Sequence, residues 1–162
     1  MAAVRLASPI GELVITASDA GLTGVWFPGK EKVPAGRPDG RGPASALLAR
    51  ACEQLAQYFS RTRTTFEIPL DAPGTAFQRR VWDVLRTIPY GTTRSYSDLA
   101  RRLGDVRLTR AVGAANGKNP IPIIVPCHRV VGANGALTGF GGGLDRKRWL
   151  LEHEGALMML GS

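Results

Sequence analysis

The sequence predicts an α+β protein, in which a small N-terminal domain with an antiparallel sheet and a helix precedes a mostly helical C-terminal domain with a helix-turn-helix. Short apolar runs separated by turn residues occupy the start of the chain, and this pattern favours strands. Apolar residues at helical spacing dominate after residue 75. The stretch Asp71-Ala72-Pro73-Gly74-Thr75 lies between the two patterns and is typical of a linker. We therefore expect domains over residues 1–70 and 71–162.

The elements of the N-terminal domain follow from local sequence. Turn-forming residues separate three apolar runs, which predicts strands over residues 4–7, 12–18 and 22–27. Residues 28–43 are rich in Gly and Pro and predict an irregular loop. Helical spacing predicts a helix over residues 44–60, and residues 66–70 are a candidate further strand.

The C-terminal domain is expected to contain helices over residues 75–87, 95–103, 107–116 and 145–154. Thr75 has the chemistry of an N-cap, Ser95 and Asp98 have the spacing of a capping box, and Gly117 is a suitable helix end. The apolar residues expected to pack in the last helix are Leu144, Trp149 and Leu150.

The pair Cys127-His128 is the clearest candidate for chemistry. It follows an apolar run, Ile121–Val125, so the thiol and the imidazole are expected at the rim of a buried segment. A thiolate is the attacking form of cysteine, and a free thiol titrates near ~8.5, so an adjacent base can activate it. The alternative is a buried structural cysteine, which is how we interpret Cys52. Two cysteines and two histidines without ligand spacing predict no metal site.

The chain is strongly basic, with a formal net charge of +8 and a pI of about 10.3, and most of the excess follows residue 70. Such a charge favours an anionic partner. Nucleic acid is the leading candidate, ahead of an acidic membrane surface, because no basic amphipathic helix is evident. A basic surface that only aids solubility is the alternative. Because no apolar run approaches the ~20 residues that span a bilayer and no signal-peptide pattern is present, we expect a cytoplasmic protein without a membrane partner.

Residues 95–116 have the form of a helix-turn-helix, with two short helices around a turn that contains glycine. One face of the second helix combines small residues with a single long cation, because helical spacing aligns Arg110, Gly113, Ala114 and Gly117. Such a face can approach a DNA duplex closely while the arginine reaches into it. The alternative is tight packing of this face on another helix.

Three further features flank the Cys-His pair. Prolines stiffen the segment after Asn119, whose amide can bridge two backbone elements, although a plain turn residue is the alternative. Residues 138–143 form a Gly-rich loop without the Lys of a phosphate-binding loop, so it suits a wall for a flat ligand. Glu154 can orient His128 in a Cys-His-acid relay, or it is a solvated charge at a helix end.

Several segments, in this order, resemble the O6-alkylguanine-DNA alkyltransferases (methylated-DNA–protein-cysteine methyltransferases). The most specific is Pro126-Cys127-His128-Arg129-Val130. The others lie at residues 77–82, 90–91, 95–96, 110–116, 119–120 and 141–144. The resemblance is strong over about residues 75–155 and weak before them.

The resemblance implies one reaction. The C-terminal domain would bind duplex DNA, rotate an O6-alkylated guanine out of the stack, and move the alkyl group irreversibly to Cys127 in a single turnover without a cofactor. His128 would take the thiol proton through a water, Glu154 would orient the imidazole, and Asn119 would brace the turn. Tyr96 would help protonate the departing guanine.

The resemblance also implies contact residues. Those of the base pocket would be Val130, Phe140, Gly141 and Lys147. Those of the DNA interface would be Arg110, Thr109, Ala111, Gly113, Ala114 and Ser95. The helix would enter the minor groove, and Arg110 would replace the flipped base in the stack. A monomer is expected, with cooperative binding along DNA left open.

Phe140, Gly141 and Thr109 depart from residues common in relatives, which leaves the preference among alkyl groups open.

Two other functions fit parts of the pattern. A non-catalytic damage-sensing DNA-binding protein would share the basic face, and a Cys-His hydrolase would share the relay but leave Arg110 unexplained.

Overall fold

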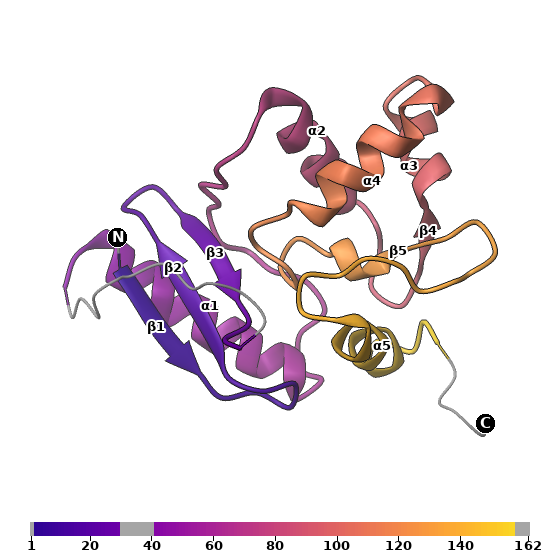
Figure 1. Ribbon diagram of the computed structural model, residues 1–162. Coiled ribbons are helices and arrows are strands. Elements are labelled where there is room, and N and C mark those ends of the chain that lie inside the picture. The colour runs from indigo at the N-terminus through magenta and orange to yellow at the C-terminus, as the bar shows by residue number, and fades with distance from the viewer. Residues whose placement is uncertain (1, 30–40, 158–162) are drawn as a thin grey trace. The chain divides into compact units, whose positions relative to one another are not determined.

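The structure, a computed structural model, describes residues 2–29 and 41–157 (Figure 1). The chain divides into two compact units, Met1–Pro73 and Gly74–Ser162. Most of the loop predicted at 28–43 lies outside the described residues. Within the described ranges, no helix combines the length and the hydrophobicity needed to cross a bilayer.

The first unit is an antiparallel sheet with one helix packed on it (Figure 1). Its strands are β1 (Ala2–Leu6), β2 (Leu13–Ala17) and β3 (Leu22–Trp26), in the order β1-β2-β3, and its helix is α1 (Pro43–Phe59). All five residues of β2, the central strand, are buried. Leu55 and Tyr58 of α1 are fully buried as well. The antiparallel sheet and the helix expected from the sequence are confirmed.

The candidate strand at residues 66–70 is a wrong prediction. Only Leu70 forms a bridge, parallel to Leu22. Pro69 has no N–H to donate, so it contributes only its carbonyl, which accepts from the Leu22 N–H at 3.0 Å. The backbones approach so closely here that a Cβ on Gly21 would lie 2.7 Å from the Leu70 carbonyl carbon. Glycine is therefore required at the turn before β3.

The second unit is mostly helical. Its helices are α2 (Ala76–Leu85), α3 (Tyr96–Arg102), α4 (Thr109–Gly117) and α5 (Leu144–His153), with short 3-10 turns η1 (Val106–Leu108) and η2 (Cys127–Arg129). Two short strands, β4 (Arg94–Ser95) and β5 (Val130–Val131), pair in parallel. The pairing attaches the residues after Cys127 to the start of α3. The sequence did not predict it, because neither segment has the length of an ordinary strand.

Side-chain caps fix where α2 and α3 begin. Thr75 accepts a hydrogen bond from the Gln78 N–H, and the Gln78 side chain accepts one from the Thr75 N–H. Ser95 and Asp98 form the same reciprocal box on α3. Each box satisfies N–H groups that the first turn of a helix leaves unpaired. The start of α3, and with it Tyr96, is therefore held rigidly.

Helix α5 packs through Leu150 and Leu151, which are fully buried. The expectation that Leu144 packs as well is wrong, because this residue is 48% exposed. Leu144 is the first residue of α5, so it extends past the elements that cover the rest of the helix. Trp149 is half-buried and stacks on the His153 ring, with 4.7 Å between the centroids.

Candidate active site

Cys127 follows a tightly wound turn. The Val125 N–H bonds to the Ile121 carbonyl at 2.9 Å, and the Cys127 N–H bonds to the Val125 carbonyl at 2.8 Å. Ile123, between them, is buried and has a φ of 74°. A β-branched residue in this left-handed region costs of order 1–3 kcal/mol, so surrounding contacts must hold the turn.

Asn119 supplies two of those contacts. Its Nδ2 donates to the Val125 carbonyl at 2.9 Å, and its Oδ1 accepts from the Ile121 N–H at 3.0 Å. The amide therefore joins the two residues whose backbones also bond to each other. This arrangement fixes the direction in which the chain enters Cys127, whose side chain is buried at the end of the turn.

His128 and Glu154 form a buried pair. His128 Nε2 lies 2.7 Å from Glu154 Oε2, and neither side chain is exposed. Glu154 therefore is not the solvated charge that the sequence left as an alternative. The pair joins η2 to the C-terminal end of α5.

Arg129 completes the cluster. Its Nε donates to Glu154 Oε1 at 2.8 Å, its Nη2 donates to Oε2 at 3.0 Å, and its Nη1 donates to the Ile88 carbonyl at 2.7 Å. The guanidinium also lies over the Tyr90 ring, 5.7 Å from its centroid. A bidentate guanidinium–carboxylate pair fixes both the charge and the orientation of the carboxylate. Glu154 is thus held in place from two sides.

The protonation states follow from these contacts. Burial by itself raises the pKa of Glu154, but the hydrogen bonds from His128 and Arg129 and the charge of Arg129 outweigh it and lower that pKa well below its usual range. Burial lowers the pKa of His128 from its ordinary value of 6.5, against the opposing effect of Glu154. At neutral pH the imidazole is neutral and its Nε2–H donates to an ionised Glu154. The Nδ1 atom then carries the lone pair.

The Nδ1 atom of His128 is buried and has no hydrogen-bond partner among the described residues. Buried polar atoms without partners are rare, and each calls for an explanation. Here the atom belongs to the residue next to Cys127. The neutral ring therefore offers a basic nitrogen on the side away from Glu154.

Lys147 brings a positive charge to the same region. Its side chain is fully buried, and its Nζ donates to the Thr138 carbonyl. Burial lowers the pKa of Lys147 to about 8, and an electrostatic interaction with Cys127 raises it slightly against that effect. A cation near the thiol favours the thiolate.

The remaining residues expected at the base pocket lie on two elements. Val130 is fully buried in β5. Phe140 is half-buried and Gly141 is exposed, in a turn closed by a bond from the Gly143 N–H to the Phe140 carbonyl at 2.9 Å. Tyr96, at the start of α3, has its hydroxyl 2.8 Å from Thr138 Oγ1. The Gly-rich loop therefore contacts α3.

Apart from Arg110, the exposed surface of α4 carries only small residues. Arg110, Ala111, Ala114 and Gly117 are exposed, and Gly113 is half-buried. The opposite face is buried through Val112 and Ala115, whose carbonyl accepts from Trp82 Nε1 at 2.8 Å. Arg110 makes no hydrogen bond or ion pair with any other residue that the structure describes.

Two residues expected at the DNA interface have structural partners. The Ser95 hydroxyl caps α3, and the Thr109 hydroxyl donates to the Val106 carbonyl at 2.6 Å. Their side chains therefore hold the two helices of the motif in shape. No group of three metal-binding side chains occurs within residues 2–29 and 41–157.

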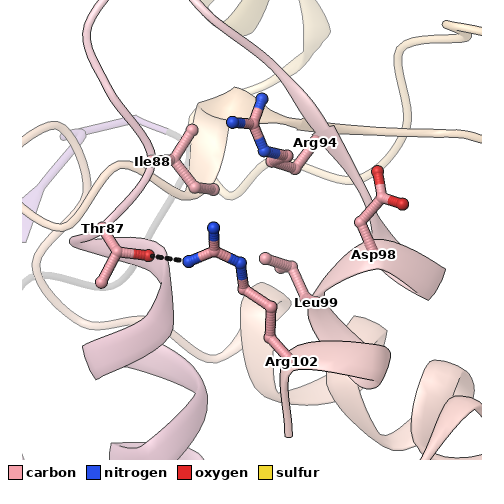
Figure 2. Close-up of a pocket in the computed structure, with 6 residues that line it drawn as sticks. All are labelled: Thr87, Ile88, Arg94, Asp98, Leu99 and Arg102. Carbon is pink, nitrogen blue, oxygen red and sulfur yellow. Dashed lines mark hydrogen bonds between the residues drawn. The ribbon is translucent and has the colours of Figure 1, made fainter.

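A pocket in the second unit borders this cluster through Ile88, whose carbonyl accepts from Arg129. Figure 2 shows its lining residues, which are Thr87, Ile88, Arg94, Asp98, Leu99 and Arg102. Arg102 Nη1 donates to Thr87 Oγ1 at 3.1 Å. Asp98 and Arg102 are one turn apart on α3, on the side of the helix away from Tyr96. None of the residues expected to act in catalysis lines this pocket.

Comparison with known proteins assigns the chain to a family. Residues 5–72 match the ribonuclease-like domain of 6-O-methylguanine DNA methyltransferase, and residues 76–156 match its DNA binding domain. A methylated-DNA–protein-cysteine methyltransferase of Mycolicibacterium paratuberculosis is 50% identical over 147 residues, which cover 91% of this chain and 88% of the relative. The chain belongs to the O6-methylguanine DNA methyltransferase family.

Other members of this family agree in sequence and in structure. The methylated-DNA–protein-cysteine methyltransferase of Methanosarcina acetivorans is 45% identical, over 92% of this chain and 95% of its own. The crystal structure of Mycobacterium tuberculosis O6-methylguanine methyltransferase matches with a TM-score of 0.85 at 46% identity, over 96% of this chain and 93% of that chain. The same protein in complex with DNA matches with a TM-score of 0.86.

Sequence reasoning missed what Arg129 and Thr138 contact in this methyltransferase. A signal for Arg129 was present, because a guanidinium between His128 and the apolar pair Val130-Val131 needs a buried partner. Nothing in the sequence identified Glu154 as that partner. Thr138 gave no signal beyond its place in the Gly-rich loop.

Replacing Arg129 by Met is expected to destabilise the protein by about 3–5 kcal/mol, because Glu154 would keep a buried charge with only His128 beside it. Denaturant unfolding at pH 7 measures the loss. The matched control is Arg107→Met, whose exposed pair with Asp105 is expected to contribute little to stability. Equal losses in the two variants would contradict the importance of the buried pair.

Lys147 is expected to make stability depend on pH in a specific direction. The pKa of Lys147 is about 8 in the folded protein and 10.5 unperturbed, so the buried cation opposes folding most below pH 8. The penalty, at most about 3 kcal/mol, fades as the pH rises toward 10.5. Unfolding of the parent and of Lys147→Met at several pH values tests this. The parent should gain stability relative to Lys147→Met as the pH rises. Parallel pH profiles of the two free energies of unfolding would show that folding does not lower the pKa of Lys147.

Proposed function

We propose that this protein repairs DNA by transferring the alkyl group of O6-alkylguanine to its own Cys127, once per molecule. One observation carries the proposal: the residue beside Cys127 is a neutral imidazole with a buried, unpartnered Nδ1, while its Nε2 is bonded to Glu154. That is the state a general base needs. Family membership supports the reaction, because relatives at 50% and 45% identity are methylated-DNA–protein-cysteine methyltransferases.

The transfer balances without a cofactor. The Cys127 thiol gives its proton toward His128 Nδ1, through a water, and the imidazolium is stabilised by Glu154. The thiolate sulfur attacks the alkyl carbon, an S–C bond forms, and the bond from that carbon to O6 breaks with its electron pair on guanine. Tyr96 protonates the guanine as it departs. The thioether has no step that reverses it, so each molecule acts once.

The neighbouring residues support these steps. Asn119 holds the turn that presents Cys127, and Lys147 stabilises the thiolate by its charge. Val130, Phe140 and Gly141 form the walls against which the extruded base lies. An extruded guanine is flat, and a wall with a glycine lets it contact backbone groups.

The α4 face is the DNA-binding surface in this proposal. Its exposed small residues, among them Ala111 and Ala114, allow a close approach to the minor groove, and they lack side chains that read bases. Arg110 enters the stack in place of the flipped guanine. The crystal structure of the Mycobacterium tuberculosis relative was determined in complex with DNA, which supports DNA as the partner. The protein acts as a monomer on its site.

The first test of this function is mass analysis of the Cys127 peptide. After incubation with duplex DNA that contains O6-methylguanine, the peptide is expected to gain the mass of one methyl group, and a second addition of substrate is expected to give no further repair. Cys127→Ser should bind the same duplex without gaining mass. An unmodified Cys127 peptide after the lesion has disappeared, or after prolonged binding, would rule the proposal out.

The second test concerns Arg110. Base flipping costs a few kcal/mol, so Arg110→Ala is expected to slow methyl transfer from duplex DNA by about tenfold or more. Transfer from a single-stranded oligonucleotide should change little, because no stack has to be filled. Arg107→Ala, an exposed arginine already paired with Asp105, is the control. A variant that repairs the duplex at the parent's rate would exclude the stacking role.

A further inference from the structure

Thr138 joins two groups that the proposed reaction uses. Its Oγ1 lies 2.8 Å from the Tyr96 hydroxyl, and its carbonyl accepts a hydrogen bond from Lys147 Nζ. Tyr96 is the expected proton donor to guanine, and Lys147 is the cation that interacts with Cys127. One loop residue therefore contacts both side chains.

The backbone hydrogen bonds of the surrounding loop show why these contacts matter. Backbone bonds close its first part, where the Gly132 N–H bonds to the Ala136 carbonyl at 2.8 Å, and its last part, from Phe140 to Gly143. Among the described residues, no backbone–backbone hydrogen bond involves residues 137–139. Thr138 is thus the point at which the middle of the loop is attached to α3 and α5.

Tyr96 lies between the helix proposed to meet DNA and the Gly-rich loop. A Cβ added to Gly113 of α4 would lie 3.7 Å from Tyr96 Cδ1, so the ring covers this glycine at the helix face proposed to meet DNA. The hydroxyl at the other end of the ring contacts the Gly-rich loop through Thr138. The phenol therefore extends from the proposed DNA-binding helix to the wall of the proposed base pocket.

The number of protons on the two hydroxyls restricts how they bond. A tyrosine hydroxyl has one proton to donate, and its oxygen can accept. When the Tyr96 proton points to guanine, the hydrogen bond to Thr138 can persist only if Thr138 donates. A donor to the phenol oxygen also stabilises the negative charge that forms there as the proton leaves.

We propose that Thr138 is a positioning residue, whose hydroxyl donates to the Tyr96 oxygen and thereby directs the Tyr96 proton to the departing guanine. This inference rests on the proposed function. The Tyr96 O–H bond breaks, the guanine that leaves with the electron pair of the C–O6 bond takes the proton, and the phenolate accepts the Thr138 hydrogen bond. Lys147 donates to the Thr138 carbonyl and interacts electrostatically with Cys127, so the other contact of Thr138 is with the cation near the thiol.

The test compares two reactions of Cys127. Methyl transfer from O6-methylguanine in duplex DNA releases a guanine that needs a proton, whereas alkylation by iodoacetamide releases iodide, which needs none. Thr138→Val keeps the shape and the carbonyl but removes the hydroxyl. It is expected to slow methyl transfer about fivefold to tenfold, the effect of one hydrogen bond, and to leave the iodoacetamide rate unchanged.

Two further variants separate this role from a structural one. Thr138→Ser keeps a hydroxyl and should transfer the methyl group at close to the parent's rate. In Tyr96→Phe, which has no phenol proton, adding Thr138→Val should cause no further loss, because contacts in one pathway are not additive.

Three results would overturn the inference: equal methyl transfer by Thr138→Val and the parent, an equal loss in the iodoacetamide reaction, or an additional loss in the Tyr96→Phe background. A parent protein that gains no methyl group at all would refute the proposed function as well. A parent that transfers normally while Thr138→Val matches it would refute only the role of Thr138.

Discussion

The site depends on one buried carboxylate. Glu154 accepts hydrogen bonds from the His128 ring and from two nitrogens of Arg129, and its side chain is fully shielded from water. A buried carboxylate is tolerated only with such partners. Because Arg129 keeps it ionised, it can fix the tautomer of His128, which leaves Nδ1 as the basic nitrogen. The base beside Cys127 therefore owes its state to a charge pair at the end of α5.

The same cluster also links distant parts of the second unit. Arg129 bonds to the Ile88 carbonyl that follows α2, while Glu154 ends α5. Strand β5, directly after Arg129, pairs with β4 at the start of α3. The turn with Cys127 is thus attached to three helices, and this explains how the unfavourable φ of Ile123 is maintained. This support fixes the position of the buried thiol of Cys127.

Tyr96 contacts both the helix proposed to bind DNA and the loop proposed to line the base pocket. Its backbone is fixed by the capping box of α3, its ring covers Gly113 of α4, and its hydroxyl contacts Thr138 of the Gly-rich loop. A Cβ on Gly113 would meet this ring at an ordinary contact distance of 3.7 Å, so the ring lies directly against the proposed DNA-binding helix. In the proposed reaction, the DNA-binding helix and the proton donor to guanine therefore share the contacts of one side chain.

Local sequence determined much of this protein: the strands and helices through their apolar spacing, the starts of α2 and α3 through Thr75 and Ser95, and the Cys-His pair through adjacency. These features depend on residues within one helical turn or one strand of each other, so a pattern in the chain is enough. The strand expected at 66–70 was wrong because only Leu70 pairs, with Leu22. The expectation that Leu144 packs was wrong because burial depends on neighbouring elements, which the local pattern does not specify. Tertiary structure alone decided that Glu154 meets Arg129, 25 residues away, and that Tyr96 meets Thr138, 42 residues away. Such contacts leave no periodic signal, because they join residues that are far apart in sequence and that only the folded chain brings together.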